Sequence, residues 1–246
     1  MKRISWQVIL GISFIALSAL LYLVQIGIFH RTHDTFFYLF QDIAFVPIQV
    51  LLVTLIIHRL LSEREKRSML KKLNMVIGAF FIEVGTMLLK SLSDLDPNPD
   101  RVRKELIVTK DWTEREFSSV SSRLKSYEYK IESQKGDLET LRSFLTEKRD
   151  FLLRLLENPN LLEHETFTDL LWAVFHLTEE LVHRVDLRSL PDTDHEHLSI
   201  DIKRVYVLLL YEWLEYMRHL KNNYPYLFSL AMRTNPFDPN ASPVVK

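Results

Sequence analysis

Two long apolar runs near the N-terminus limit the folds that this chain can adopt. They extend from Ser5 to Phe29 and from Phe36 to Leu61, with a polar segment, His30 to Thr35, between them. A bilayer core of about 30 Å is crossed by about 20 mostly apolar helical residues, and each run reaches that length. The pattern therefore predicts a transmembrane hairpin in residues 1–61.

The first apolar run is longer than the core of a secretory signal peptide, which has about 7–15 apolar residues. It has no small-residue cleavage pattern, and a second apolar run follows it at once. We therefore expect an uncleaved membrane anchor.

Basic residues flank the hairpin on one side. Lys2 and Arg3 precede the first run, whereas the turn carries one cation, Arg31, and one anion, Asp34. The second run is followed by a basic cluster: Arg64, Lys66, Arg67, Lys71 and Lys72. Since basic flanks stay on the cytoplasmic side, both termini should be cytoplasmic in a prokaryotic-type inner or plasma membrane. The cluster is either a topology signal alone or also a contact for anionic lipid head groups, worth about 1 kcal/mol per basic residue.

Each apolar run also contains polar residues. A hairpin that turns near Thr32 places Asp42 of the second run level with Tyr22 of the first. An acid at mid-span costs about 2.5–3.5 kcal/mol on insertion scales, so it usually has a partner or a function. Asp42 is either hydrogen-bonded to Tyr22 or close enough to the outer interface to reach water. The alternative is a proton or cation site in an oligomeric pore.

The rest of the chain reads as helical, so the predicted fold class is all-α. Residues 62–93 form a basic and then apolar helix, and residues 94–234 form a cytoplasmic helical domain after a proline-containing break, Asp94 to Asp100. The apolar stretch Met75 to Leu89 contains Glu83, so a helix buried in the domain is favoured over a third span. Residues 235–246 contain three prolines and are expected to be a disordered tail, in which Asn235-Pro236-Phe237 resembles a short docking motif.

One long helix, about 112–157, is predicted in the middle of the domain. Thr113 and Glu116 have capping-box spacing at its start. One heptad position is apolar throughout, at Phe117, Leu124, Ile131, Leu138, Leu145 and Leu152, as in coiled coils. A straight helix of this length would span about 58 Å. It therefore either projects and pairs with another chain or folds back at Lys135-Gly136-Asp137, and both readings remain open.

The best candidate for chemistry lies between His176 and His183. His176, Glu180 and His183 recur at helical spacing, and Glu179-Glu180-x-x-His183 resembles half of the metal motif of ferritin-like di-iron bundles. That family also needs a second Glu-x-x-His pair, and Glu212, Glu215 and His219 have a different spacing. At 100° per residue, the three candidate ligands point away from the apolar face of their predicted helix, 166–185. A solvated polar face is therefore favoured over a metal site.

A second group of metal-binding residue types lies in the segment Asp186 to His197, which is predicted to be a polar loop. It contains His195 and His197 together with Asp192 and Asp194. Surface loops of this composition usually bind nothing specific, so only opportunistic metal binding is expected there.

Composition removes several classes of function. The chain has no cysteine, which removes disulfides and thiolate sites, and its net charge of -1 gives no reason to expect nucleic-acid binding. With 5 glycines and no phosphate-loop or nucleophile motif, the sequence predicts no catalytic residue and no cofactor.

The leading hypothesis is therefore a membrane-anchored helical scaffold or interaction protein. It would form homo-oligomers through the hairpin and the 117–155 helix and recruit a cytoplasmic protein partner. The alternatives are a membrane-tethered metal-dependent enzyme that uses the 176–183 face and a small oligomeric channel, or channel regulator, with Asp42 in the membrane.

Overall fold

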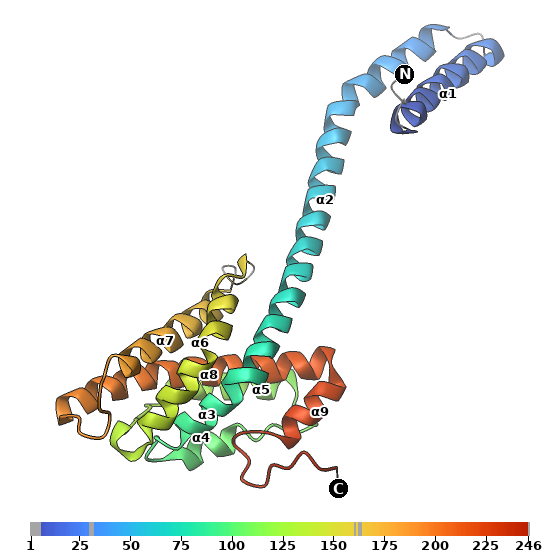
Figure 1. The fold of residues 1–246 in the computed structure, drawn as a ribbon. Helices are drawn as coiled ribbons and strands as arrows, with labels where there is room; N and C mark the ends of the chain where they lie inside the picture. The colour runs from blue at the N-terminus through green and yellow to red at the C-terminus, as the bar shows by residue number, and fades with distance from the viewer. Residues whose placement is uncertain (1–5, 30–31, 160, 162–163, 246) are drawn as a thin grey trace. The chain divides into compact units, whose positions relative to one another are not determined.

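The computed structural model describes residues 6–29, 32–159, 161 and 164–245 (Figure 1). These residues are mostly helical and include no strand, which confirms the all-α prediction. The chain divides into two compact units, residues 1–66 and 67–246.

The N-terminal unit contains α1 (Trp6–Phe29) and the first part of α2 (Thr32–Phe80). Two stretches, Ile9–Ile28 and Thr32–Glu65, are long and apolar enough to cross a membrane. Most of their large apolar side chains are exposed, among them Ile15 (72%). Within this unit, the Tyr22 hydroxyl donates a long hydrogen bond of 3.5 Å to Asp42 Oδ2.

A third stretch, Lys72–Ser93, is also long and apolar enough to span a bilayer, but it is partly buried in the C-terminal unit. It comprises the end of α2, a π-helix (Phe81–Gly85) and α3 (Thr86–Ser93). The π-helix ends where both the backbone N–H and the hydroxyl of Thr86 bond to the Phe81 carbonyl. A Cβ on Gly85 would lie 2.6 Å from the Phe81 ring, so only glycine allows this approach. Such single-turn π segments are rare and concentrate at functional sites.

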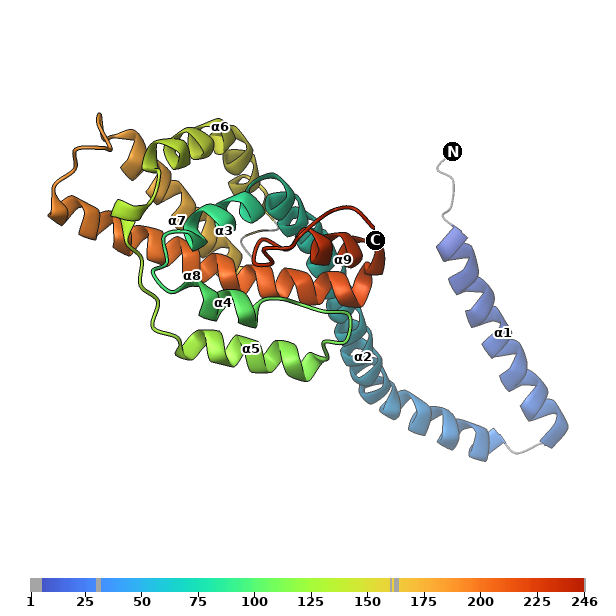
Figure 2. The same cartoon turned by 90° about the horizontal axis from the view of Figure 1, so that it is seen from below.

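The C-terminal unit is built around α8 (Asp192–Asn223), the longest helix of this unit, which runs through its middle (Figures 1 and 2). On one side of α8 lies α7 (Glu165–Val182), which packs in turn against α6 (Leu138–Leu156). α3 and α5 (Glu114–Ser126) also pack against α8. Apolar residues surround most of α8, and Val205, Leu209 and Leu210 are fully buried, as expected for a central helix.

Three short elements complete the C-terminal unit: α4 (Pro99–Glu105), a 3₁₀ turn (Ser133–Lys135) and α9 (Pro225–Arg233). The predicted break after Ser93 is present. The predicted capping box is also present, because the Thr113 hydroxyl accepts a bond from Glu116 N–H and the Glu116 carboxylate accepts one from Thr113 N–H.

Of the two readings of the segment 112–157, the straight continuous helix is wrong, and the fold-back near Lys135-Gly136-Asp137 is the one present. The structure has two helices, α5 and α6, separated by an irregular segment that contains the 3₁₀ turn. The heptad residues are nevertheless all buried within the one chain: Phe117, Leu124, Ile131, Leu138, Leu145 and Leu152. The pattern thus marks a core that is formed by folding back. At the bend, a Cβ on Gly136 would lie 2.0 Å from Leu95 Cδ2, which explains the glycine there.

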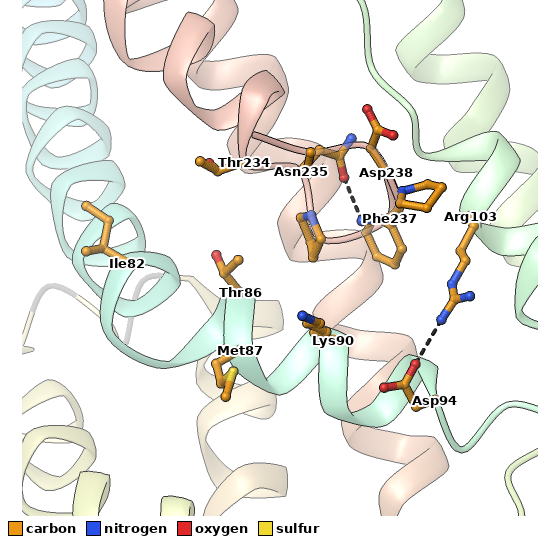
Figure 3. Close-up of a pocket in the computed structure, with 13 residues that line it drawn as sticks. Ile82, Thr86, Met87, Lys90, Asp94, Arg103, Thr234, Asn235, Phe237 and Asp238 are labelled. Atoms are coloured by element: carbon orange, nitrogen blue, oxygen red, sulfur yellow. Dashed lines mark hydrogen bonds and ion pairs between the residues drawn. The ribbon is translucent and has the colours of Figure 1, made fainter. Parts of the chain in front are cut away.

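The expectation of a disordered tail is wrong for its first residues, Asn235–Phe237, which we call the C-terminal strap. The Asn235 amide donates to the Leu106 carbonyl at 2.8 Å, and Asn235 Oδ1 accepts from Phe237 N–H at 2.9 Å. Phe237 is buried edge-on against Trp213 of α8, with ring centroids 5.1 Å apart. The strap and α3 border a pocket of about 600 Å³ (Figure 3). The docking motif is therefore bound by its own chain.

Candidate functional site

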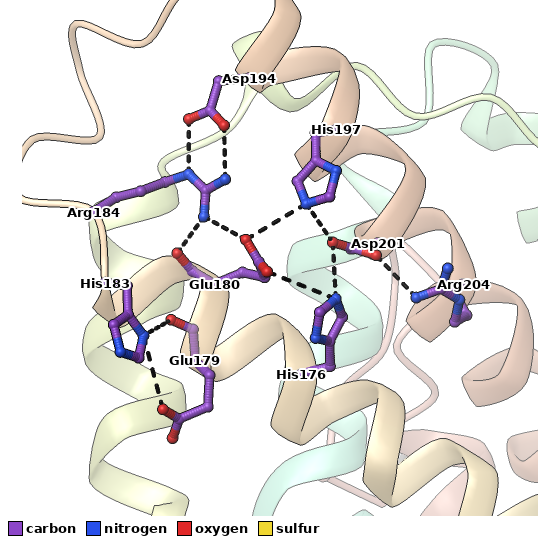
Figure 4. Close-up of polar contacts among 9 residues, drawn as sticks. All are labelled: His176, Glu179, Glu180, His183, Arg184, Asp194, His197, Asp201 and Arg204. Atoms are coloured by element: carbon purple, nitrogen blue, oxygen red, sulfur yellow. Dashed lines mark hydrogen bonds and ion pairs between the residues drawn. The ribbon is translucent and has the colours of Figure 1, made fainter.

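Two neighbouring helices each present a histidine and a carboxylate one turn apart. α7 carries His176 and Glu180, and α8 carries His197 and Asp201. Residues four apart lie on the same helix face, so each helix offers one imidazole and one carboxylate. Figure 4 shows the four side chains converging between the two helices. We call these four residues the α7–α8 cluster.

The four side chains are in close contact. Asp201 Oδ2 lies 3.3 Å from His176 Nε2 and 3.3 Å from His197 Nε2. Glu180 closes the group, with its Oε2 at 3.5 Å from His197 Nε2 and its Oε1 at 3.8 Å from His176 Nε2. His176, Glu180 and Asp201 each offer a ligand atom within 4.8 Å of the other two, and His197 borders this group through Asp201 and Glu180.

Burial differs within the cluster. The Asp201 side chain is only 4% exposed, whereas His176 and His197 are about half exposed, at 47% and 50%. Asp201 Oδ2 is buried and has no hydrogen-bond partner among the described residues. The cluster thus has a buried carboxylate, that of Asp201, and two histidine side chains that are open to solvent.

An arginine binds each carboxylate: Arg204 binds the Asp201 oxygen that is not the one facing the histidines, and Arg184 binds the Glu180 oxygen that also faces His197. Arg204 lies 2.9 Å from Asp201 Oδ1, and Arg184 lies 2.7 Å from Glu180 Oε2. Arg184 also forms a two-bond contact with Asp194, at 2.7 Å for each bond. Hydrogen bonding by Arg184 lowers the pKa of Glu180 and that of Asp194 below their ordinary values, so both are carboxylates at neutral pH.

The structure brings together two of the three residues predicted from the 176–183 pattern. His176 and Glu180 belong to the cluster, but His183 does not. His183 follows the end of α7 and its Nδ1 lies 2.8 Å from the Glu179 carbonyl oxygen. The predicted apolar face is buried at Leu170, Val174, Leu177 and Leu181, whereas Val185 lies beyond the helix end and is 97% exposed.

Sequence reasoning missed the half of the cluster on α8. The segment predicted as a loop to His197 is helical from Asp192 onward, so His197 and Asp201 lie one turn apart. A helix-start signal was present, because Pro191 is followed by two acids, Asp192 and Asp194, in the first turn. His195 is held elsewhere, with its Nδ1 at 3.0 Å from the Ser133 hydroxyl.

Among the residues predicted to contact lipid head groups, Arg64 and Lys72 are exposed. The side chains of Lys66, Arg67 and Lys71 lie outside the described part of the chain. The contact of this cluster with lipid therefore remains a prediction.

Comparison with known proteins assigns the chain to a family. Residues 69–233 match the "Uncharacterized protein MJ1433, C-terminal helical domain" and residues 2–61 match the "MJ1433, N-terminal helical domain". The chain belongs to the MJ1433 family. It is 47% identical over 233 residues to "Uncharacterized protein MJ1433" of Methanocaldococcus jannaschii, an alignment that covers 95% of this chain and 94% of that protein. No solved structure matches the chain.

Along the sequence, the boundary between the two MJ1433-family domains lies between residues 61 and 69, which includes the border between the two compact units. The N-terminal helical domain covers the two apolar stretches of the first unit. The C-terminal helical domain covers α3 to α9 and includes the whole α7–α8 cluster. Both parts of the chain are thus features of the family.

Proposed function

We propose that this MJ1433-family protein anchors a helical binding domain to the cytoplasmic face of a prokaryotic plasma membrane. Residues 1–61 would cross the bilayer twice, and residues 67–246 would recruit a protein partner. The observation that carries the proposal is the exposed apolar surface of Ile9–Ile28 and Thr32–Glu65. Monomeric soluble proteins rarely expose apolar patches of more than a few hundred Å², so lipid is the natural environment of this surface.

The charge distribution supports the orientation. Cations lie before the first span and after the second, whereas the turn between them has no net charge if His30 and His33 are neutral. Positive flanks are retained on the cytoplasmic side. Both termini would then be cytoplasmic.

Oligomerisation, if it accompanies anchoring, would involve the hairpin. The heptad residues of α5 and α6 are buried within one chain and offer no free seam to a second copy. Most large apolar side chains of Ile9–Ile28 and Thr32–Glu65 are exposed and would be accessible to other membrane helices.

Cysteine labelling tests the proposal directly, because the natural chain has no cysteine. Single variants Thr32→Cys, Ser62→Cys and Asn240→Cys would be expressed in bacterial cells and treated with a membrane-impermeant maleimide. Thr32→Cys should react in intact cells, whereas Ser62→Cys and Asn240→Cys should react only after permeabilisation. The chain should also stay in the membrane fraction at alkaline pH.

Two outcomes would contradict the proposal. Labelling of Asn240→Cys in intact cells would place the helical domain outside, as a third span at Lys72–Ser93 would require. Release of the chain by alkaline carbonate would exclude membrane anchoring altogether.

A further inference from the structure

We infer that His176, Glu180, His197 and Asp201 form a binding site for one divalent transition-metal ion of the zinc class. The site would join α7 to the first turns of α8. It goes beyond membrane anchoring, since it lies wholly within the C-terminal unit and does not depend on the hairpin.

The separation of the ligand atoms fits a tetrahedral ion. Zinc–nitrogen and zinc–oxygen bonds of about 2.0–2.1 Å place neighbouring ligands about 3.3–3.4 Å apart at the corners of a tetrahedron. Asp201 Oδ2 lies 3.3 Å from each imidazole nitrogen, and Glu180 Oε2 lies 3.5 Å from His197 Nε2. The fourth contact, Glu180 Oε1 to His176 Nε2, is longer at 3.8 Å. The two histidines face different oxygens of Glu180, and Arg184 already bonds to Oε2. A rotation of the Glu180 carboxylate and a shift of the His197 ring would be needed to bring all four ligands to one ion.

The buried oxygen of Asp201 supplies an independent observation. Asp201 is 4% exposed, and its Oδ2 points between two imidazole nitrogens without a hydrogen bond from either. A buried carboxylate oxygen without a donor is costly. The two imidazole nitrogens lie within ion-pair distance of this oxygen, at 3.3 Å each, but neither forms a hydrogen bond to it. A cation bound at the centre satisfies it and also explains why both ring nitrogens face it.

Two arginines bind the carboxylates of the cluster and hold them in place. Arg204 binds the outer oxygen of Asp201, so the inner oxygen is left to face the imidazoles. Arg184 binds Glu180 and Asp194 and fixes the Glu180 carboxylate from the α8 side. Outer-shell partners of this kind orient metal ligands. They also offset part of the negative charge of the two carboxylates.

The ligand types select the metal. Imidazole suits zinc, copper, iron and nickel, whereas magnesium and calcium prefer sets made of oxygen alone. Four protein ligands in a tetrahedral arrangement are typical of a closed zinc site. The site is therefore expected to hold a structural ion and to leave no open position for a substrate.

The test uses the full-length protein in detergent, stripped with a chelator and then titrated with Zn²⁺ against a chromophoric competitor. Wild type should bind one equivalent, and Mg²⁺ at a hundredfold excess should not displace it. Bound Co²⁺ should give the intense visible absorption of a tetrahedral ion. His197→Ala and Asp201→Asn should each weaken Zn²⁺ binding at least 100-fold.

A matched control lies on the same helix. Glu179 and His183 repeat the spacing of a carboxylate and an imidazole four apart, at the solvent-facing end of α7, but do not join the cluster. Glu179→Gln and His183→Ala should bind Zn²⁺ as wild type does. His197 is half exposed, so His197→Ala should keep the helical circular dichroism of the wild type and should lose only the Zn²⁺-induced rise in Tm.

Three results would overturn the inference. The first is the absence of a stoichiometric metal in folded wild type. The second is a loss of binding in His183→Ala that exceeds the loss in His197→Ala. The third is a weak, octahedral Co²⁺ spectrum. None of these results would bear on membrane anchoring.

Discussion

Glu212 is a buried acid in the middle of α8. It is 4% exposed, and its Oε1 accepts a 2.5 Å hydrogen bond from the Thr166 hydroxyl at the start of α7. Burial raises the pKa of Glu212 above its ordinary value of 4.5, while the bond from Thr166 and the nearby His164 act in the opposite direction. The side chain therefore ties α7 to α8 but resists ionisation.

Glu212 should make the stability of the domain depend on pH. Because its pKa is higher in the folded than in the unfolded state, the stabilising contribution is complete below pH 4.5 and is lost as pH rises through the folded-state pKa. Glu212→Gln keeps the acceptor for Thr166 and removes the charge. Its free energy of unfolding should match that of wild type near pH 4 and exceed it at pH 8.

Urea denaturation in detergent at the two pH values measures this difference. Glu215→Gln, at an exposed position on the same helix, is the control and should change stability little at either pH. A Glu212→Gln variant that is equally destabilised at pH 4 and pH 8 would show that the carboxyl is needed for a reason other than its charge.

At the scale of elements, the joint between α5 and α6 decides how the heptad residues are used. The backbone between the helices finds partners far along the sequence. Glu132 N–H bonds to the Leu95 carbonyl, and Ser133 bonds to Ser199 and His195, more than 60 residues away. These contacts satisfy the N–H groups of Glu132 and Ser133, which a continuous helix would have satisfied internally.

Leu145 provides a test of this use of the heptads. It is fully buried in α6, so Leu145→Ala should lower the free energy of unfolding by about 2–5 kcal/mol. The native mass of the detergent-solubilised protein should not change, because the residue packs within its own chain. Ser143→Ala, at an exposed position of the same helix, is the control. A change of stoichiometry with unchanged stability would indicate an intermolecular seam.

The same joint shows what the sequence could and could not predict. Periodicity identified the buried positions, from Phe117 to Leu152, because burial follows apolar spacing whether a helix is whole or broken. It could not decide between a straight helix and a fold-back at Lys135-Gly136-Asp137, because the groups that stabilise the break come from Leu95 and from α8. His197 was missed for a related reason. Its metal-ligand spacing to Asp201 becomes visible only when the helix is known to begin at Asp192.

At the scale of the whole molecule, the C-terminal strap closes the helical domain. Its two anchor points are the Leu106 carbonyl between α4 and α5 and the Trp213 ring in α8. Segments that are more than 100 residues apart are thereby joined after the last helix. The strap should therefore contribute to the stability of the whole C-terminal unit.

Phe237→Ala measures that contribution. The side chain is 1% exposed, and removal of a buried phenylalanine costs about 3–5 kcal/mol. The free energy of unfolding of the entire domain should fall by this amount, and thermal and urea unfolding should each remain a single transition at a lower Tm or urea midpoint. Val244→Ala, at a position that is 65% exposed, should leave both transitions in place. A shift as small as that of Val244→Ala would mean that the strap adds little stability.

The strap also determines how reporter proteins should be joined to this chain. Nested truncations fused to an enzyme or a fluorescent protein are a common way to map topology. Any fusion that ends before Phe237 would leave Trp213 uncovered and invite degradation by cellular proteases. A weak reporter signal would then result from degradation of the fusion protein, and it could be misinterpreted as export of the reporter across the membrane. Fusions placed after Lys246 keep the strap and separate the two effects.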